Sequence, residues 1–157
     1  MTQRIDLATA GAGAYKMMAG LEAYVRSSGL ERPLIELVKL RASYINGCAY
    51  CVDMHTKDAR AAGETEQRLF AVPVWRDTPF FTPRERAALA WTEATTLISR
   101  DGVPDGVPDD VYDAAKAQFS EKELADLTMA VIAINGWNRL AIAFHADVGS
   151  YQPPAKS

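Results

Sequence analysis

Residues 36–55 read ELVKLRASYINGCAYCVDMH, and this succession of an apolar run, an Asn-Gly break and a second helical pattern organises the whole chain. The positions around Glu36 are almost all apolar, which predicts a buried helix from Pro33 to about Ile45. Asn-Gly ends that helix, and a further helix is expected from about Cys48 to Ala62. The segment therefore predicts two consecutive helices joined by a tight turn.

The remaining sequence also favours helices. Two capping boxes, Thr82–Glu85 and Ser120–Glu123, predict helices that run to about Ile98 and about Val148. Further helical spacing is found at residues 7–26 and 64–71, and sustained period-two alternation is absent from the sequence. We expect an all-α, single-domain helical bundle over residues 1–150, followed by a flexible tail at residues 151–157. The Pro- and Gly-rich segment Asp101–Pro108 is interpreted as an exposed loop.

Composition excludes several classes of protein. The chain has 157 residues, of which 48% are hydrophobic and 24% charged, with a net charge of −3 and no cluster of Lys or Arg. A nucleic-acid binder is therefore not expected. The longest aliphatic run, Met129–Ile134, is far shorter than the roughly 20 residues that cross a bilayer, and residues 1–7 do not resemble a signal peptide. These features predict a cytoplasmic protein with no membrane partner.

The two cysteines carry the clearest chemical signal. Cys48 and Cys51 are the only cysteines, and a pair three residues apart closes almost no loop, so it stabilises the fold little. On a helix, Cys48, Cys51 and His55 fall within a sector of about 60°. The first turn of a helix favours a thiolate, and His55 lies one turn beyond Cys51, where it can accept the thiol proton. We therefore expect a lowered pKa for the Cys51 thiol, and we expect Cys48, which begins the turn, to be the more exposed cysteine. Glu36 in its apolar helix needs a partner, which His55 can supply.

The spacing of Glu36, Cys48, Cys51 and His55 resembles the signature of the alkylhydroperoxidase D-like proteins, within the carboxymuconolactone decarboxylase-like superfamily. The similarity continues through Lys57 to Gly63 and, more weakly, through the closing segment Asn135–Leu140, and together it covers about half of the chain.

This resemblance implies an all-α fold that assembles into homotrimers or homohexamers. It also implies that Cys51 attacks a peroxide, that Cys48 resolves the sulfenic acid, and that Glu36 and His55 relay the proton. One position departs from the best-known member, which has a second histidine where this chain has Tyr50.

The leading hypothesis is a thiol-dependent peroxidase, a peroxiredoxin-type alkylhydroperoxidase with an antioxidant role. Its substrate is a small-molecule peroxide, and it works through a redox-active Cys48–Cys51 disulfide. Because there is no third cysteine, an external dithiol must reset the enzyme, and a lipoyl group or a lipoylated reductant protein suits that role. No bound cofactor and no metal are expected, since the Cys-Ala-Tyr-Cys segment lacks the second Cys-x-x-Cys of a zinc ribbon.

Two other functions stay open. One is a carboxymuconolactone decarboxylase-like acid–base enzyme, which would leave the cysteines idle. The other is a non-catalytic redox-sensing protein, whose thiols would oxidise without turnover. Among the other residues, Trp137 and the other aromatic side chains suit a core or a subunit interface better than a pocket. Arg139 fits an interface ion pair, and His145 is expected to have a structural role near a helix end.

Overall fold

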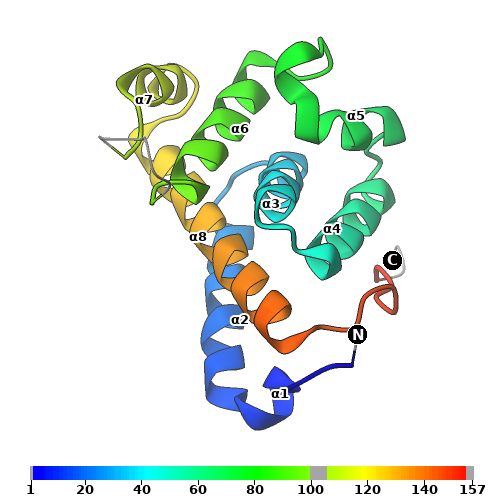
Figure 1. The fold of residues 1–157 in the computed structure, drawn as a ribbon. Coiled ribbons are helices and arrows are strands. Elements are labelled where there is room, and N and C mark those ends of the chain that lie inside the picture. The colour runs from blue at the N-terminus through cyan, green and yellow to red at the C-terminus, as the bar shows by residue number, and fades with distance from the viewer. Residues whose placement is uncertain (1, 100–105, 155–157) are drawn as a thin grey trace.

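The chain folds into helices only, as the computed structural model shows for residues 2–99 and 106–154, and no strand occurs in these ranges. Figure 1 shows the arrangement of the helices. The elements are α1 (Leu7–Ala10), α2 (Ala12–Ser27), α3 (Arg32–Asn46), α4 (Ala49–Ala61), α5 (Glu66–Ala71), the 3-10 helix η1 (Val72–Asp77), α6 (Pro83–Thr96), α7 (Asp109–Lys116) and α8 (Glu121–Phe144). The expected all-α, single-domain class is confirmed.

Helix α3 lies at the centre of the molecule. It packs against α4, α6 and α8, and Figure 1 shows it enclosed by them. Residues 34–40 are all buried, including Glu36 and Lys39. Burial on every side explains the nearly continuous apolar sequence of this helix. The site residues on α3 are thus held by the best-packed element of the fold.

Local signals fix where the main helices begin and end. Both capping boxes are present, with Thr82 paired to Glu85 and Ser120 paired to Glu123. Gly47 closes α3 with a left-handed backbone at φ 69°, a conformation that glycine adopts without steric cost. The expected helices over α3, α4, α6 and α8 are therefore confirmed.

The structure differs from the sequence-based expectation in three ways. The helix expected over residues 7–26 is divided at Gly11 into α1 and α2. Helices η1 and α7 were not anticipated, because each is short and lies beside prolines. Helix α8 ends at Phe144 and not near Val148, since His145 adopts a left-handed conformation at φ 52° and reverses the chain. Of the expected loop Asp101–Pro108, residues 101–105 lie outside the described part of the chain.

Helix α8 is long and apolar enough, by length and composition, to cross a membrane. The core helix of a soluble protein passes the same test, and α8 packs against α2, α3, α4, α6 and α7. Packing within the chain buries 33% of the apolar stretch and so accounts for part of its composition.

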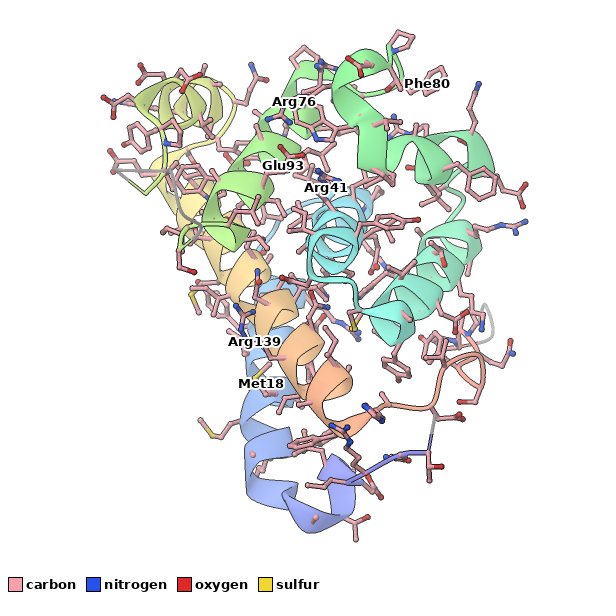
Figure 2. The ribbon with its side chains drawn as sticks, viewed as in Figure 1. Met18, Arg41, Arg76, Phe80, Glu93 and Arg139 are labelled. Carbon is pink, nitrogen blue, oxygen red and sulfur yellow. The ribbon has the colours of Figure 1, made fainter. Side chains whose placement is uncertain are left out.

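Glu93 joins three elements through one carboxylate. Figure 2 labels it together with Arg41 and Arg76, which approach it from α3 and η1. Its Oε1 accepts hydrogen bonds from Arg41 Nε at 2.8 Å and from Trp75 Nε1 at 2.7 Å, and its Oε2 pairs with Arg76. The carboxylate thereby ties η1 to the core formed by α3 and α6.

We expect Glu93→Ala to lower the free energy of unfolding by about 2–3 kcal/mol, because Arg41 and Trp75 lose their acceptor in a partly buried position. Arg60→Ala is the control, since both members of the Arg60–Glu66 pair are more than half exposed. That variant should change stability by less than about 0.5 kcal/mol. Urea denaturation measures both, and equal effects of the two variants would contradict the assigned role of Glu93.

Candidate active site

The two cysteines lie at the start of α4, directly after the Gly47 turn. Cys48 is the N-cap residue, and its Sγ accepts a hydrogen bond from the Cys51 amide at 3.4 Å. Both thiols are free, and each residue is only 1% exposed. The expectation that Cys48 is the more exposed cysteine, drawn from its place at the turn, is therefore wrong. Helix α8 packs against α4, and its Ile134 is buried in the same apolar cluster as both cysteines.

Hydrogen bonding gives the two thiols different acidities. The side chain of Cys51, its amide and the side chain of Asn138 all donate toward Cys48, and they lower the Cys48 pKa to about 7 in spite of burial. The pKa of Cys51 is raised, because its proton is held against Cys48 and because it is buried. The sequence placed the lowered pKa on Cys51, whereas the geometry favours the first thiolate on Cys48. A helix N-terminus acts most strongly on its capping residue, which is Cys48.

Glu36 and His55 form a buried pair across α3 and α4. The distance from His55 Nδ1 to Glu36 Oε2 is 2.8 Å, as expected from a carboxylate within an apolar helix. Burial alone would raise the pKa of Glu36, but the hydrogen bond with His55 and the charges of Lys39 and Arg32 hold it below its usual value. An ionised Glu36 accepts a hydrogen bond from the Nδ1–H group, and in that tautomer Nε2 of His55 is the basic nitrogen.

A cavity of about 540 Å³ opens beside this pair. Cys51, His55 and Glu36 line it, whereas Cys48 does not. Nε2 of His55 makes no hydrogen bond within the described residues, and no buried side-chain nitrogen or oxygen there lacks a partner, so Nε2 is open to the cavity. The expected hydrogen bond between His55 and the Cys51 thiol is not formed in the structure. Because Cys51 and His55 both line the cavity, a substrate within it has access to both.

The walls of the cavity are mainly apolar and aromatic. Trp137, Tyr50 and Tyr15 line it, and the rings of Tyr15 and Trp137 meet edge to face with centroids 5.7 Å apart. Trp137 thus lines a pocket, contrary to the favoured interpretation, whereas Trp75 and Trp91 pack in the core as expected.

The remaining candidates have structural positions. Arg139 is exposed and donates to the backbone and side-chain oxygens of Asn135, and it contacts no carboxylate within the described residues. Figure 2 labels it on α8. His145 provides the left-handed residue that ends α8, which agrees with the structural role expected for it.

Three residues near the site were not identified from the sequence. Asn138 is fully buried beneath the cysteine turn, where it accepts from Asn46 at 2.8 Å and donates to Ser43 at 3.1 Å. Asp58 lines the cavity and accepts a hydrogen bond from the Tyr151 hydroxyl at 2.7 Å. An Asn-x-x-Asn pair in an apolar helix was a visible signal for Asn138. Asp58 and Tyr151 carried no comparable signal.

One group of side chains near the thiols has the composition of a metal site. Glu36, His55 and Asp58 have potential ligand atoms within 4.8 Å of one another, and neither cysteine belongs to the group. In the structure His55 Nδ1 is bonded to Glu36 Oε2, and Asp58 Oδ1 accepts from Tyr151. The absence of a metal stays a prediction.

We expect one thiol per chain to titrate near pH 7, because the hydrogen bonds from Cys51 and Asn138 stabilise the Cys48 thiolate. The ultraviolet absorbance of the thiolate, followed against pH, measures this. Cys48→Ser should remove the neutral transition, because it removes the thiol whose pKa these hydrogen bonds lower. Two thiols that both titrate at or above the free value of about 8.5 would contradict the assignment.

Comparison with known proteins places this geometry in context. Residues 12–94 match the carboxymuconolactone decarboxylase family. The uncharacterized protein YdfG of Bacillus subtilis is 40% identical over 143 residues, which cover 91% of this chain and 95% of YdfG.

Two solved structures extend the comparison. A protein of unknown function from Agrobacterium tumefaciens, described as a candidate antioxidant defence protein AhpD, has a TM-score of 0.87 and 45% identity, covering 98% of this chain and 100% of that one. A peroxidase-related protein from Ralstonia eutropha, described as an alkylhydroperoxidase AhpD core, has a TM-score of 0.75 at 18% identity. The match covers 92% of this chain and 74% of that one, and at this identity it shows a shared fold.

Proposed function

Because the chain belongs to the carboxymuconolactone decarboxylase family, we propose that it uses this shared helical scaffold as a thiol-dependent peroxidase for organic hydroperoxides. The observation that carries the proposal is the common location of its parts. Cys51 and the Glu36–His55 pair line a single cavity, and the second thiol, Cys48, lies one helical turn from Cys51. The AhpD-type description of the Agrobacterium structure supports the same chemistry.

Cys51 is the attacking thiol in this proposal, because it lines the cavity and Cys48 does not. Its thiolate attacks the terminal oxygen of the hydroperoxide and the O–O bond breaks. This yields a Cys51 sulfenic acid and an alkoxide, which takes a proton to become the alcohol. The Cys48 thiolate then attacks the Cys51 sulfur, hydroxide leaves as water after protonation, and a disulfide forms. An external dithiol returns both sulfurs to the reduced state.

His55 serves as the proton relay in this cycle. Its Nε2 faces the cavity, where it can take the proton of the Cys51 thiol once a substrate or water bridges the two groups. The same nitrogen can then protonate the leaving alkoxide. Glu36 fixes the tautomer and stabilises the imidazolium that forms between these steps.

The reductant and the location follow from the same proposal. A lipoyl arm, free or on a lipoylated protein, is slender enough to enter the cavity and reach the buried Cys51. We place the reaction in the cytoplasm, where thiols are kept reduced.

Steady-state consumption of cumene hydroperoxide with a panel of dithiols tests the proposal. We expect turnover with at least one dithiol, such as dihydrolipoamide, and none without a reductant beyond a single equivalent per chain. Stoichiometric oxidation without cycling would instead favour a redox-sensing protein.

The Glu36–His55 pair also suits an acid–base enzyme of the carboxymuconolactone decarboxylase type, which needs no thiol. The two functions differ in their dependence on Cys48. An acid–base activity should survive in Cys48→Ser protein, whereas peroxide turnover should stop after one equivalent.

We further propose that the chain forms a homotrimer or homohexamer. Apolar side chains are exposed on α2 and α8, where Met17 is 76% exposed and Ile132 is 51% exposed. Covering them in an assembly would remove apolar area from water. Light scattering at micromolar concentration is expected to give the mass of a trimer or hexamer, and a clean monomer mass would contradict this assembly.

A further inference from the structure

The segment that follows α8 returns to α4 and is fastened there. Lys57 Nζ donates to the carbonyl oxygens of Gly149 at 3.3 Å and Tyr151 at 3.0 Å, and it also pairs with Asp53 at 2.9 Å. Figure 1 shows this C-terminal segment lying beside α4. We call residues 146–151 the strap. Tyr151, which the sequence assigned to a flexible tail, is therefore part of the packed structure.

The strap brings the side chain of Tyr151 into the wall of the cavity. Its hydroxyl donates to Asp58 Oδ1 at 2.7 Å, and an oxygen of Asp58 lies within 4.8 Å of a ring nitrogen of His55. Burial, the bond to Asp58 and the nearby negative charges raise the pKa of Tyr151 to about 12. The phenol is thus neutral at physiological pH, and its O–H group donates its hydrogen bond to Asp58.

The hydrogen bond to Asp58 determines whether the Tyr151 hydroxyl can donate to a ligand or only accept from it. A phenol has one proton to donate and oxygen lone pairs that accept. Because the O–H of Tyr151 already donates its hydrogen bond to Asp58, the hydroxyl oxygen can act toward the cavity only as an acceptor. A ligand that contacts it must therefore bring its own donor, and among the groups of a hydroperoxide only the terminal O–H qualifies.

We propose that Tyr151 is a positioning residue that accepts a hydrogen bond from the O–H group of the substrate hydroperoxide and of the alcohol product, with Asp58 setting its polarity and the strap holding it in place. This inference rests on the proposed function. The oxygen that carries the O–H is the one that Cys51 attacks, so the bond would orient the reacting atom. Tyr151 transfers no proton in this role.

The test uses binding, so it needs no turnover. Cumyl alcohol carries the required O–H, and cumyl methyl ether has the same frame without it. Fluorescence of Trp137, which lines the cavity, or calorimetry measures the affinity of both for the reduced protein. We expect the protein to bind the alcohol about 3- to 10-fold more tightly than the ether, the range for one neutral hydrogen bond. Tyr151→Phe should abolish that preference while it retains binding of the ether.

Tyr24→Phe is the matched control. Tyr24 also donates to a carboxylate, Asp126, at 2.7 Å, but it does not line the cavity, so this variant should keep the full preference. Lys57→Met leaves the Tyr151 hydroxyl intact and releases the strap, and it should lose the preference as Tyr151→Phe does.

Three outcomes would overturn the inference: equal affinity of the unaltered protein for alcohol and ether, no binding of either, or an unchanged preference in Tyr151→Phe. These results are independent of the peroxidase assay. A protein that prefers the alcohol but never consumes hydroperoxide would retain the Tyr151 site and lose the proposed function. Normal turnover of hydroperoxide without a preference for the alcohol over the ether would support the proposed function and overturn the role of Tyr151.

Discussion

Cys51→Ser protein is expected to lose peroxide reduction by a factor on the order of 10³ or more, because the cavity then offers no thiol to the substrate. Cys48 has the lower pKa, but it does not line the cavity, whereas Cys51 does. A thiolate at Cys48 cannot attack a substrate that does not reach it. The rate of hydroperoxide loss under single-turnover conditions measures the effect directly, without a contribution from the reductant.

Cys48→Ser is the matched variant, since it removes the other thiol of the same turn. It should react once and stall with an oxidised Cys51, which dimedone traps as a sulfenic acid or mass spectrometry detects as an over-oxidised product. The opposite pattern, with a fast first step in Cys51→Ser and none in Cys48→Ser, would show that the more acidic thiol attacks. His55 would then have no claim to a catalytic role.

His55→Ala should slow the first step by roughly 10²- to 10⁴-fold, the loss typical of a positioned base. The reason lies in the 2.8 Å bond to Glu36, which holds the ring with Nε2 toward the cavity. Glu36→Gln should act in the same direction and less strongly, because an amide still orients the ring but carries no charge to stabilise the imidazolium. Single-turnover rates of both variants measure the two contributions.

Glu66→Gln is the control for the change of carboxylate to amide, since Glu66 is about half exposed and forms an exposed ion pair with Arg60. It should leave the rate within about twofold. The pH dependence gives a further check. Because the pKa of Glu36 is lowered, its carboxylate stays charged throughout the pH range in which a glutamate ordinarily titrates. It becomes protonated only in more acidic solution. A rate that falls as Glu36 titrates near neutral pH would contradict the relay.

Sequence reasoning succeeded where the signal was local. Glu36 within a run of apolar residues indicated a buried carboxylate, and His55 at the right helical spacing was its evident partner. The capping boxes at Thr82 and Ser120 were also readable, because each is contained in four residues.

It failed where the deciding contact is distant in the chain. The burial of Cys48 depends on α8, whose Ile134 is buried in the same apolar cluster, and no pattern near Cys48 records that packing. Tyr151 and Asp58 are 93 positions apart, and their hydrogen bond follows from the reversal at His145, which is not a residue type expected there.

The unequal acidity of the two thiols has a consequence for the reductive half of the cycle. A dithiol that enters the cavity meets the sulfur of Cys51 first, because that is the sulfur facing it. Attack there expels Cys48, and the hydrogen bonds that lower its pKa to about 7 make it a good leaving group. Access and leaving-group ability thus select the same route. The mixed disulfide between enzyme and reductant would form on Cys51, and Cys48 would be the thiolate released.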